Sequence, residues 1–233
     1  MKTIGLLGGM SWESTQSYYR AINEAVREQL GGLHSAKIVL YSVDFAEIEA
    51  LQVQGDWETA GQLLAAAASA VERAGADFLV ICTNTMHKVV PAIAAGISMP
   101  ILHIADATAD ELMAQGVKKA GLLGTRFTME QAFYKDRLIA RGIAVVVPDQ
   151  ADRDHVNRVI YEELCLGAIK ADSRALYLDI IHRLQLQGAE AVILGCTEIS
   201  LLVQPSDTPV ALFDTTAIHA QQAVRQALAQ EIR

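Results

Sequence analysis

Two short segments repeat one pattern, and each ends in side chains that can exchange protons. GADFLVICTNT runs from Gly75 to Thr85, and GAEAVILGCTE runs from Gly188 to Glu198. They align without a gap, which places Thr83 against Cys196. Thiols serve as acids and bases because their pKa of about 8.5 falls near cations and helix N-termini. Two such groups at equivalent positions suit stereoinversion, in which one takes a proton from one face of a carbon and the other returns a proton to the opposite face.

The two cysteines near these positions, Cys82 and Cys196, could each be either a packed core residue or a functional one. A free cysteine is often a small buried hydrophobe, but Thr197 and Glu198 follow Cys196 directly and favour a functional role. Cys82, directly before Thr83, is the alternative candidate for the catalytic group. The repeat aligns it with a glycine, and side chains alternate along a strand, so we expect Cys82 to point away from Thr83 and to pack in the core.

Short apolar runs alternate with longer amphipathic stretches, which indicates βαβ units and a mainly parallel sheet. The expected strands are Thr3–Leu7, Ala36–Ser42, Phe78–Cys82, Ile101–Ile104, Lys119–Leu123, Ala144–Val147, Ala191–Leu194 and Val210–Phe213. The expected helices are Trp12–Leu30, Trp57–Ala74, Ala105–Gln115, Met129–Arg141, Asp152–Leu166, Ser173–Gln187 and Thr216–Ile232.

Two further pairs of similar segments occur in the same order, and their separation in sequence is nearly that of the first pair. GLLGGM at Gly5–Met10 returns as GLLGTR at Gly121–Arg126, and MPILHIAD resembles TPVALFD further along. A shared offset predicts two similar, pseudo-symmetric α/β lobes. We assign residues 1–104 plus 214–233 to the first lobe and residues 105–213 to the second.

Ligands of open parallel sheets bind at the carboxyl ends of the strands. The repeated polar clusters all follow such ends, so we expect them to converge on one cleft. Cys196 is predicted to lie at a strand-to-helix junction, where backbone N–H groups favour an anion.

Composition excludes several classes of partner and site. The chain of 233 residues has a net charge of −8 and 6% aromatic residues, which argues against nucleic-acid binding. No apolar run is long enough for a membrane span, and we find no signal-peptide pattern. Three cysteines without C-x-x-C spacing favour neither a disulfide framework nor a metal site. A cytoplasmic location is expected.

The motifs GLLGGMS, NTMH and ILGCTEIS resemble those of the cofactor-independent aspartate/glutamate racemases, over essentially the whole chain. The resemblance implies two flavodoxin-like lobes, an active site in the cleft between them, and no pyridoxal phosphate, metal or other cofactor. It implies a small-molecule amino acid as substrate, Cys196 as an acid–base group, and a homodimer, the common state in the family. The remaining implied site residues are Asn84, Thr85, Thr125 and Thr197, as ligands of the α-carboxylate and amino group, and Met10 and Ser11, as lining of the cleft.

The chain departs from the family pattern at Thr83, where a cysteine usually precedes Asn-Thr. A threonine hydroxyl is a far weaker base than a thiol at neutral pH. We therefore expect Thr83 and Cys196 to form an asymmetric pair. Cys196 then exchanges the α-proton of one enantiomer readily, and the opposite direction is slow.

A second departure concerns the side chain of the substrate. A distal carboxylate in a dry pocket needs a cationic partner, usually arginine. Aspartate-specific relatives carry basic residues after the second strand and in the motif resembling IYEELCLG. Here residues 43–72 contain neither Lys nor Arg, and Cys165 stands where lysine is expected. With Gln52 and Cys165 as neutral replacements, we predict that neutral or polar amino acids are accepted as well as, or instead of, aspartate and glutamate.

Two other functions fit a chain with one thiol at the site. One is decarboxylation or cis–trans isomerisation of a small dicarboxylic acid in the same fold, and the other is a two-lobed protein that only binds metabolites. His87, which follows the Asn-Thr motif, either orients a catalytic group or bonds its neighbours. His103 and Asp106 are candidates for residues that support the catalytic groups without touching the substrate.

Overall fold

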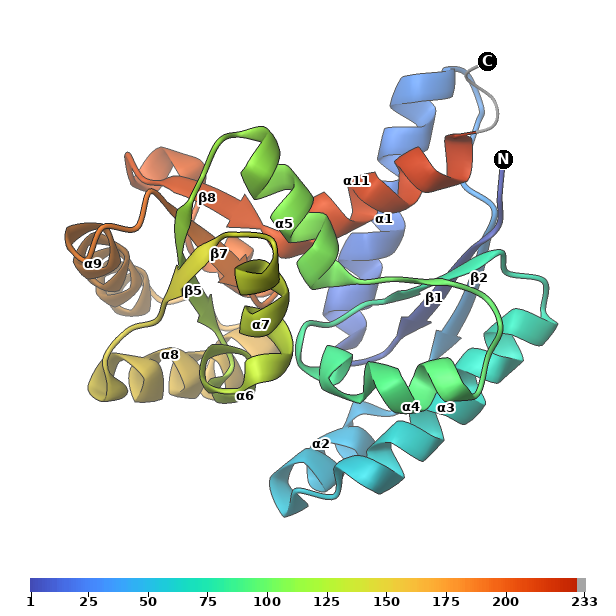
Figure 1. Cartoon of the computed structure of the whole chain (residues 1–233), viewed down its shortest axis with the longest axis horizontal. Coiled ribbons are helices and arrows are strands. Elements are labelled where there is room, and N and C mark those ends of the chain that lie inside the picture. The colour runs from blue at the N-terminus through green and yellow to red at the C-terminus, as the bar shows by residue number, and fades with distance from the viewer. Residues whose placement is uncertain (230–233) are drawn as a thin grey trace. The chain divides into compact units, whose positions relative to one another are not determined.

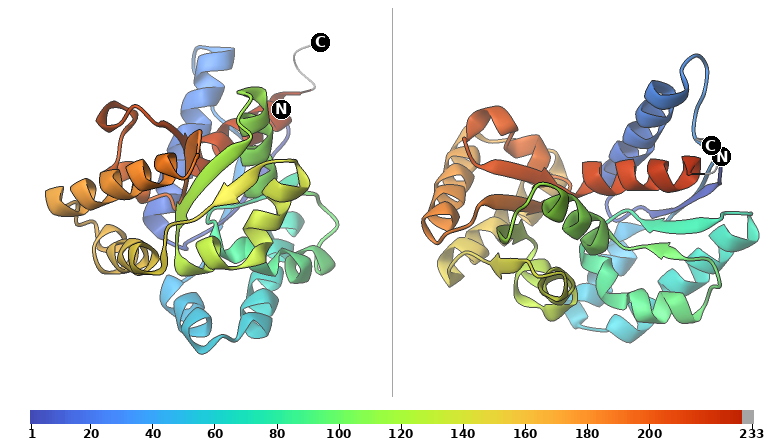
Figure 2. Two further views of the ribbon diagram at one scale, coloured as in Figure 1. Left: turned by 60° about the vertical axis from the view of Figure 1, so that its left-hand side comes forward. Right: turned by 45° about the horizontal axis from the view of Figure 1, so that its top comes forward.

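The computed structural model describes residues 1–229 and divides the chain into two compact units. Unit 1 comprises Met1–Ile104 and the segment from His219 onward, and unit 2 is Ala105–Ile218. The predicted division returned to the first lobe after residue 213, whereas the structure returns after Ile218. Each unit is a four-stranded parallel sheet with helices on both faces (Figures 1 and 2), which confirms the predicted α/β class.

The sheet of unit 1 has the strand order β2-β1-β3-β4. Its central strands are apolar throughout and buried, as expected for a parallel sheet covered on both sides. The strands are β1 (Ile4–Gly8), β2 (Ile38–Ser42), β3 (Phe78–Ile81) and β4 (Ile101–Leu102).

Two separate cores cover the faces of this sheet. Helices α2, α3 and α4 pack on one face, and α1 and α11 pack on the other (Figure 1). The backbone amide of Lys2 donates to the carbonyl of Ala227, so the start of the chain lies beside the end of α11 (Figure 2). The helices are α1 (Trp12–Leu30), α2 (Phe45–Gln54), α3 (Trp57–Arg73), α4 (Val90–Ala95) and α11 (Thr215–Leu228), with a 3-10 turn, η1 (Thr85–Val89), before α4.

Unit 2 repeats the same topology, with the strand order β6-β5-β7-β8. A core under β5 and β7 joins the sheet to α8, α9 and α10. The strands are β5 (Lys119–Gly124), β6 (Ala144–Val146), β7 (Ala191–Gly195) and β8 (Ala211–Asp214). The helices are α5 (Ile104–Ala114), α6 (Arg126–Glu130), α7 (Ala132–Ala140), α8 (Gln150–Glu162), α9 (Ala171–Leu186) and α10 (Ile199–Leu202), with the 3-10 turns η2 (Leu164–Leu166) and η3 (Pro205–Asp207).

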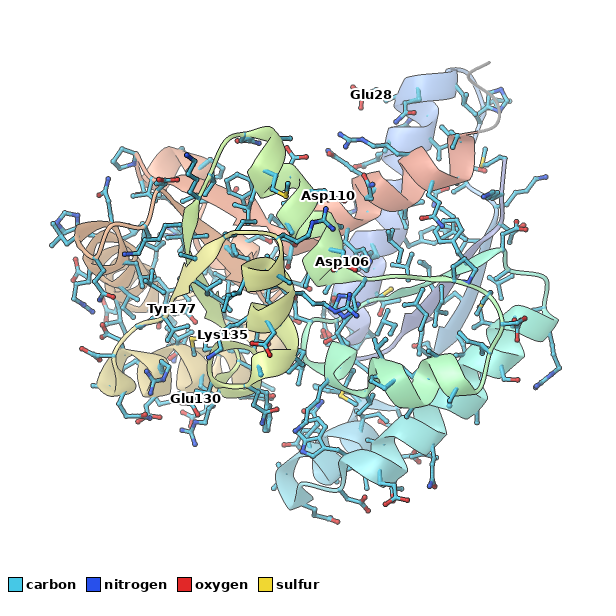
Figure 3. All side chains as sticks on the ribbon, viewed as in Figure 1. Glu28, Asp106, Asp110, Glu130, Lys135 and Tyr177 are labelled. Atoms are coloured by element: carbon cyan, nitrogen blue, oxygen red, sulfur yellow. The ribbon has the colours of Figure 1, made fainter. Side chains whose placement is uncertain are left out.

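Ion pairs join α5 to α7 on the surface of unit 2. Asp106 and Asp110 lie one turn apart on α5 (Figure 3) and pair with Arg137 and Arg141 of α7. The Arg137–Asp106 distance is 2.7 Å. Asp106 therefore fastens two helices of this unit together, and nothing in its contacts supports the role behind the active site that the sequence suggested.

All eight predicted strands are present, and the predicted helices differ from the observed ones mainly at their ends. The helix expected over Met129–Arg141 is split, because Gln131 is extended, with φ −85° and ψ 157°. The short helices α2, α4 and α10 were not predicted. The end of the helix expected over Thr216–Ile232 lies outside the described residues. Among residues 1–229, no helix is both long and apolar enough to cross a membrane.

Candidate active site

The loop after β1 is shaped by a glycine and by the cap of α1. Gly9 has φ +92°, and a Cβ there would lie 2.2 Å from the carbonyl oxygen of Val43, so only glycine fits. The hydroxyl of Thr15 accepts the Gly9 amide at 2.8 Å. Ser11 is the N-cap of α1 and accepts the amide of Ser14 at 3.3 Å. These bonds hold the buried Met10–Ser11 segment, which contains a cis peptide bond, at the carboxyl end of β1.

The end of β3 lies beside this loop, because β1 and β3 are paired neighbours. The amide of Thr83 donates to the carbonyl of Ile81 at 2.9 Å, so the chain turns directly after the strand. Asn84 and Thr85 are buried where η1 begins, and Thr83 is half-buried. Unit 1 therefore gathers the predicted residues of both motifs at one edge of its sheet.

Cys82 lies on the other side of this strand end, in the core. Its side chain is fully buried in the cluster formed with α1 and α11, and burial raises the pKa of its thiol. The Ser14 hydroxyl donates to its carbonyl at 3.0 Å and ties the end of β3 to α1. The orientation agrees with strand alternation, and the Cys82 side chain packs in the core.

Gln52 and Lys88 place polar groups between α2, α3 and η1. The Gln52 side chain is buried, and its amide donates to the Met86 sulfur at 3.0 Å. The Lys88 ammonium lies 3.7 Å from the centre of the Trp57 ring at the start of α3, and burial lowers its pKa. Although residues 43–72 lack basic side chains, a cation from the next motif packs against them. The analysis of the sequence did not identify this lysine.

In unit 2, the ends of β5 and β7 approach closely through two glycines. Gly124 pairs with Gly195, and a Cβ on Gly195 would lie 2.7 Å from the carbonyl oxygen of Leu123. Thr125 follows as the N-cap of α6, and its hydroxyl accepts the amide of Thr128 at 3.4 Å. Cys196 follows Gly195 directly, so Thr125 and Cys196 belong to neighbouring strand ends.

The Cys196 thiol donates a hydrogen bond to Oε2 of Glu198 at 3.0 Å. Cys196 lies at the predicted strand-to-helix junction, but the expectation that this junction favours its anion is wrong. Burial, followed by the negative charge of Glu198 and the nearby Cys165, raises the pKa of Cys196 well above its usual range. The Glu198 amide lowers this pKa, but its effect is smaller. Cys196, which is partly buried beside Glu198, therefore favours the thiol over the thiolate.

Thr197 is buried beside this pair and is held through both side chain and backbone. The Thr216 hydroxyl donates to that of Thr197 at 3.0 Å, and the Ser200 hydroxyl donates to the Thr197 carbonyl at 2.8 Å. The Thr215 hydroxyl donates to the carbonyl of Leu194 at 2.9 Å. The start of α11 thus fixes the loop that carries Cys196.

Cys165 lies in η2, half-buried against the same core as Cys196. Glu163 in this segment is buried and accepts the Ser173 hydroxyl at 2.6 Å, with Arg158 at 3.4 Å and Lys170 at 3.5 Å. Tyr177 (Figure 3) donates to the Val156 carbonyl at 3.0 Å and joins α9 to α8 below this segment. The motif that lacks the expected lysine is therefore flanked by two basic side chains, Arg158 and Lys170, and both pair with Glu163.

Thr83 belongs to unit 1 and Cys196 to unit 2, at topologically equivalent strand ends. The sequence did not identify Glu198 as a member of the site, although its spacing of two from Cys196 was visible. Within residues 1–229, no group of three His, Cys, Asp or Glu side chains is arranged to hold a metal ion.

A family model and several known proteins are similar to this chain. The sequence profile of the family described as Asp/Glu/Hydantoin racemase matches residues 7–223. The broad specificity amino-acid racemase RacX of Bacillus subtilis is 24% identical, over 98% of this chain and 99% of its own. A Yersinia pestis protein of known crystal structure is 60% identical, with a TM-score of 0.92 over 98% of this chain and all of its own. An aspartate racemase homologue from Pyrococcus horikoshii is 36% identical, with a TM-score of 0.85 over 97% and 99% of the two chains.

Proposed function

This chain belongs to the Asp/Glu/hydantoin racemase family, and we propose that it is an amino-acid racemase that works without pyridoxal phosphate, using Cys196 and Thr83 as its acid–base pair. The observation that carries the proposal is the thiol of Cys196, hydrogen-bonded to Glu198 at the carboxyl end of a central strand. A thiol with an adjacent carboxylate can both deliver and receive a proton.

Glu198 gives Cys196 a route to its reactive form. The S–H proton moves along the 3.0 Å hydrogen bond to Oε2 of Glu198, which leaves a thiolate. The thiolate then takes the α-proton of the bound amino acid and leaves a carbanion. A proton delivered from the Thr83 hydroxyl to the opposite face completes inversion, and solvent carries the proton held by Glu198 to the threonine alkoxide, which restores both groups.

The reverse reaction demands more of Thr83. To remove an α-proton, its hydroxyl must act as the base, and a hydroxyl is a far weaker base than a thiolate. Cys196, as a thiol, is ready to protonate the carbanion that results. We therefore propose fast α-proton exchange for the enantiomer that faces Cys196 and slow exchange for the other.

The remaining polar side chains at the strand ends bind the substrate. We assign the α-carboxylate and amino group to Asn84, Thr85, Thr125 and Thr197, which are all buried. The hydroxyls of Thr125 and Thr197 are held by hydrogen bonds from Thr128 and Thr216, which limits the entropy lost on binding. Met10 and Ser11, from the loop after β1, line the site.

Two neutral side chains set the specificity. Gln52 offers an amide buried against Met86, and Cys165 offers a thiol where a cation would select a carboxylate. The basic side chains near Cys165 pair with Glu163, and Lys88 packs on Trp57. We therefore propose that neutral and polar amino acids are substrates as well as, or instead of, aspartate and glutamate. The broad specificity of the relative RacX supports this proposal.

The test is a panel of enantiopure amino acids in heavy water, scored for deuterium at the α-carbon without added cofactor. We expect incorporation with one enantiomer of several neutral or polar amino acids, and its loss in Cys196→Ala. A binding protein would retain affinity in that variant and show no incorporation in either. A strong preference for aspartate over serine-like substrates contradicts the proposed specificity. Sedimentation tests the homodimer that the family resemblance implies.

A further inference from the structure

His87 lies in η1, four residues after Thr83, and both ring nitrogens bind backbone atoms. Nδ1 lies 2.7 Å from the carbonyl oxygen of Thr83, and Nε2 lies 3.2 Å from the amide nitrogen of Ile104. The side chain is buried. These two contacts connect the end of β3 to the start of α5.

The partners fix the proton on the ring. The Ile104 amide can only donate, so Nε2 must be the unprotonated acceptor. The Thr83 carbonyl can only accept, so Nδ1 carries the ring proton and donates it. His87 is therefore neutral, with its proton on Nδ1.

We infer that His87 is a positioning residue for Thr83, an inference that rests on the proposed function. The Thr83 amide already donates to Ile81, and the bond from His87 holds the carbonyl. With both of its backbone polar groups bound, Thr83 keeps one backbone conformation, and its hydroxyl is presented from a fixed position. Acid–base groups depend on such placement, because reactivity falls steeply with displacement.

Two other imidazoles hold the ring of His87 in place. The His103 ring packs edge-on at 4.5 Å between centroids, and the His219 ring does so at 5.8 Å. His219 is in turn fixed by Tyr18 and by the carbonyl of Leu102, each at 2.8 Å. A flip of the His87 ring would break both of its backbone hydrogen bonds.

The equivalent position in unit 2 is built differently. The residue four positions after Cys196 is Ser200, and its hydroxyl donates to the carbonyl of Thr197 rather than to that of Cys196. The Cys196 carbonyl accepts the amide of Ile199 at 3.1 Å. The hydrogen bonds of His87 thus accompany Thr83, the weaker acid–base group, for which precise placement matters more.

Three variants separate the two bonds of His87. Asparagine places its amide nitrogen near the Nδ1 position and keeps the bond to Thr83, glutamine reaches the Nε2 position and keeps the bond to Ile104, and alanine loses both. Deuterium incorporation is measured for each enantiomer separately. We expect His87→Gln and His87→Ala to slow the Thr83-dependent direction by about tenfold, the equivalent of one hydrogen bond, and His87→Asn to preserve it. Deuterium exchange into the enantiomer that faces Cys196 needs only proton removal and return by Cys196, so it serves as the internal control and stays within about twofold in all three.

A merely structural role predicts that both directions fall together in all three variants, and that result overturns the inference. A second readout needs no turnover: nitrogen-15 spectra of the wild-type imidazoles should show His87 protonated at Nδ1 and bare at Nε2. The opposite tautomer also overturns the inference. If the wild-type protein incorporates deuterium into neither enantiomer, the proposed function is refuted instead. The spectra then still decide whether His87 makes these two hydrogen bonds.

Discussion

The fully buried His219 makes the stability of unit 1 depend on pH. Its Nε2–H donates to the carbonyl of Leu102, its Nδ1 accepts the Tyr18 hydroxyl, and the two distances are both 2.8 Å. Burial lowers the pKa of His219 from 6.5 to about 4, against a smaller upward effect of the bond to Leu102. Acidification therefore favours the unfolded chain, in which this imidazole can take up a proton.

The magnitude follows from the two pKa values. An unfolded histidine protonates as the pH falls below about 6.5, while the folded one stays neutral until about pH 4. The stability due to neutral His219 is therefore complete above pH 6.5 and is lost as the pH falls toward 4. The full loss is about 3 kcal/mol, of which about 2 kcal/mol falls between pH 8 and pH 5.

Urea unfolding followed by tryptophan fluorescence measures this loss, because both tryptophans, Trp12 and Trp57, lie in unit 1 with His219. From pH 8 to pH 5 we expect the wild type to lose about 2 kcal/mol more unfolding free energy than His219→Gln, whose amide retains a donor for Leu102. His34→Gln, at an exposed histidine of the same unit, is the matched control and should behave as the wild type. Equal losses in the wild type and His219→Gln would refute the reasoning.

Three other variants address the site. Thr83→Cys should accelerate the slow direction of exchange by at least about tenfold, since it supplies a thiol; an unchanged rate for that enantiomer contradicts the assignment of Thr83. Glu198→Gln removes a carboxylate that raises the pKa of Cys196, so iodoacetamide should alkylate Cys196 faster at neutral pH. Peptide mass spectrometry measures that rate, and slower alkylation would contradict the charge of Glu198 as a cause of the raised pKa of Cys196. Gly9→Ala meets the carbonyl of Val43 at a positive φ and should cost about 2 kcal/mol or more, measured as a drop in Tm; an unchanged Tm contradicts the observed loop.

The architecture could be predicted because its signals are periodic and repeated. Buried parallel strands are continuous apolar runs, and the echo of Gly75–Thr85 in Gly188–Glu198 marked equivalent strand ends in two similar units. In the register that aligns Gly5 with Gly121, Tyr18 aligns with Tyr134, and both are fully buried.

Helix α2 was missed because its apolar face is only half-buried and has weak periodicity. Its caps were nevertheless visible in the sequence. The Asp44 side chain accepts the Ala46 amide, and Gly55 ends the helix with φ +75°. Gln52 was predicted as a site residue, although α2, the helix that carries it, was not predicted.

The electrostatics of the site could not be predicted, because they depend on side-chain directions after the strands end. The burial of the Cys196 thiol, and then the turn of Glu198 back toward it, raise the pKa of Cys196 and favour the thiol. The role of His87 depends on the amide of Ile104, which is distant in the sequence. Such contacts arise from the tertiary fold, and local spacing carries no sign of them.

Helix α11 completes the core of unit 1 from the far end of the chain. Its Ala220, Ala223, Val224 and Leu228 pack with Tyr18 and other residues of α1. The strands of unit 1 are made first, yet one face of their sheet is covered by α1 alone until these residues are added. Unit 2 is a continuous segment with its own core. A chain truncated after Ile218 should therefore bind chaperones through the incompletely covered face of the first sheet, although the second unit keeps all of its strands.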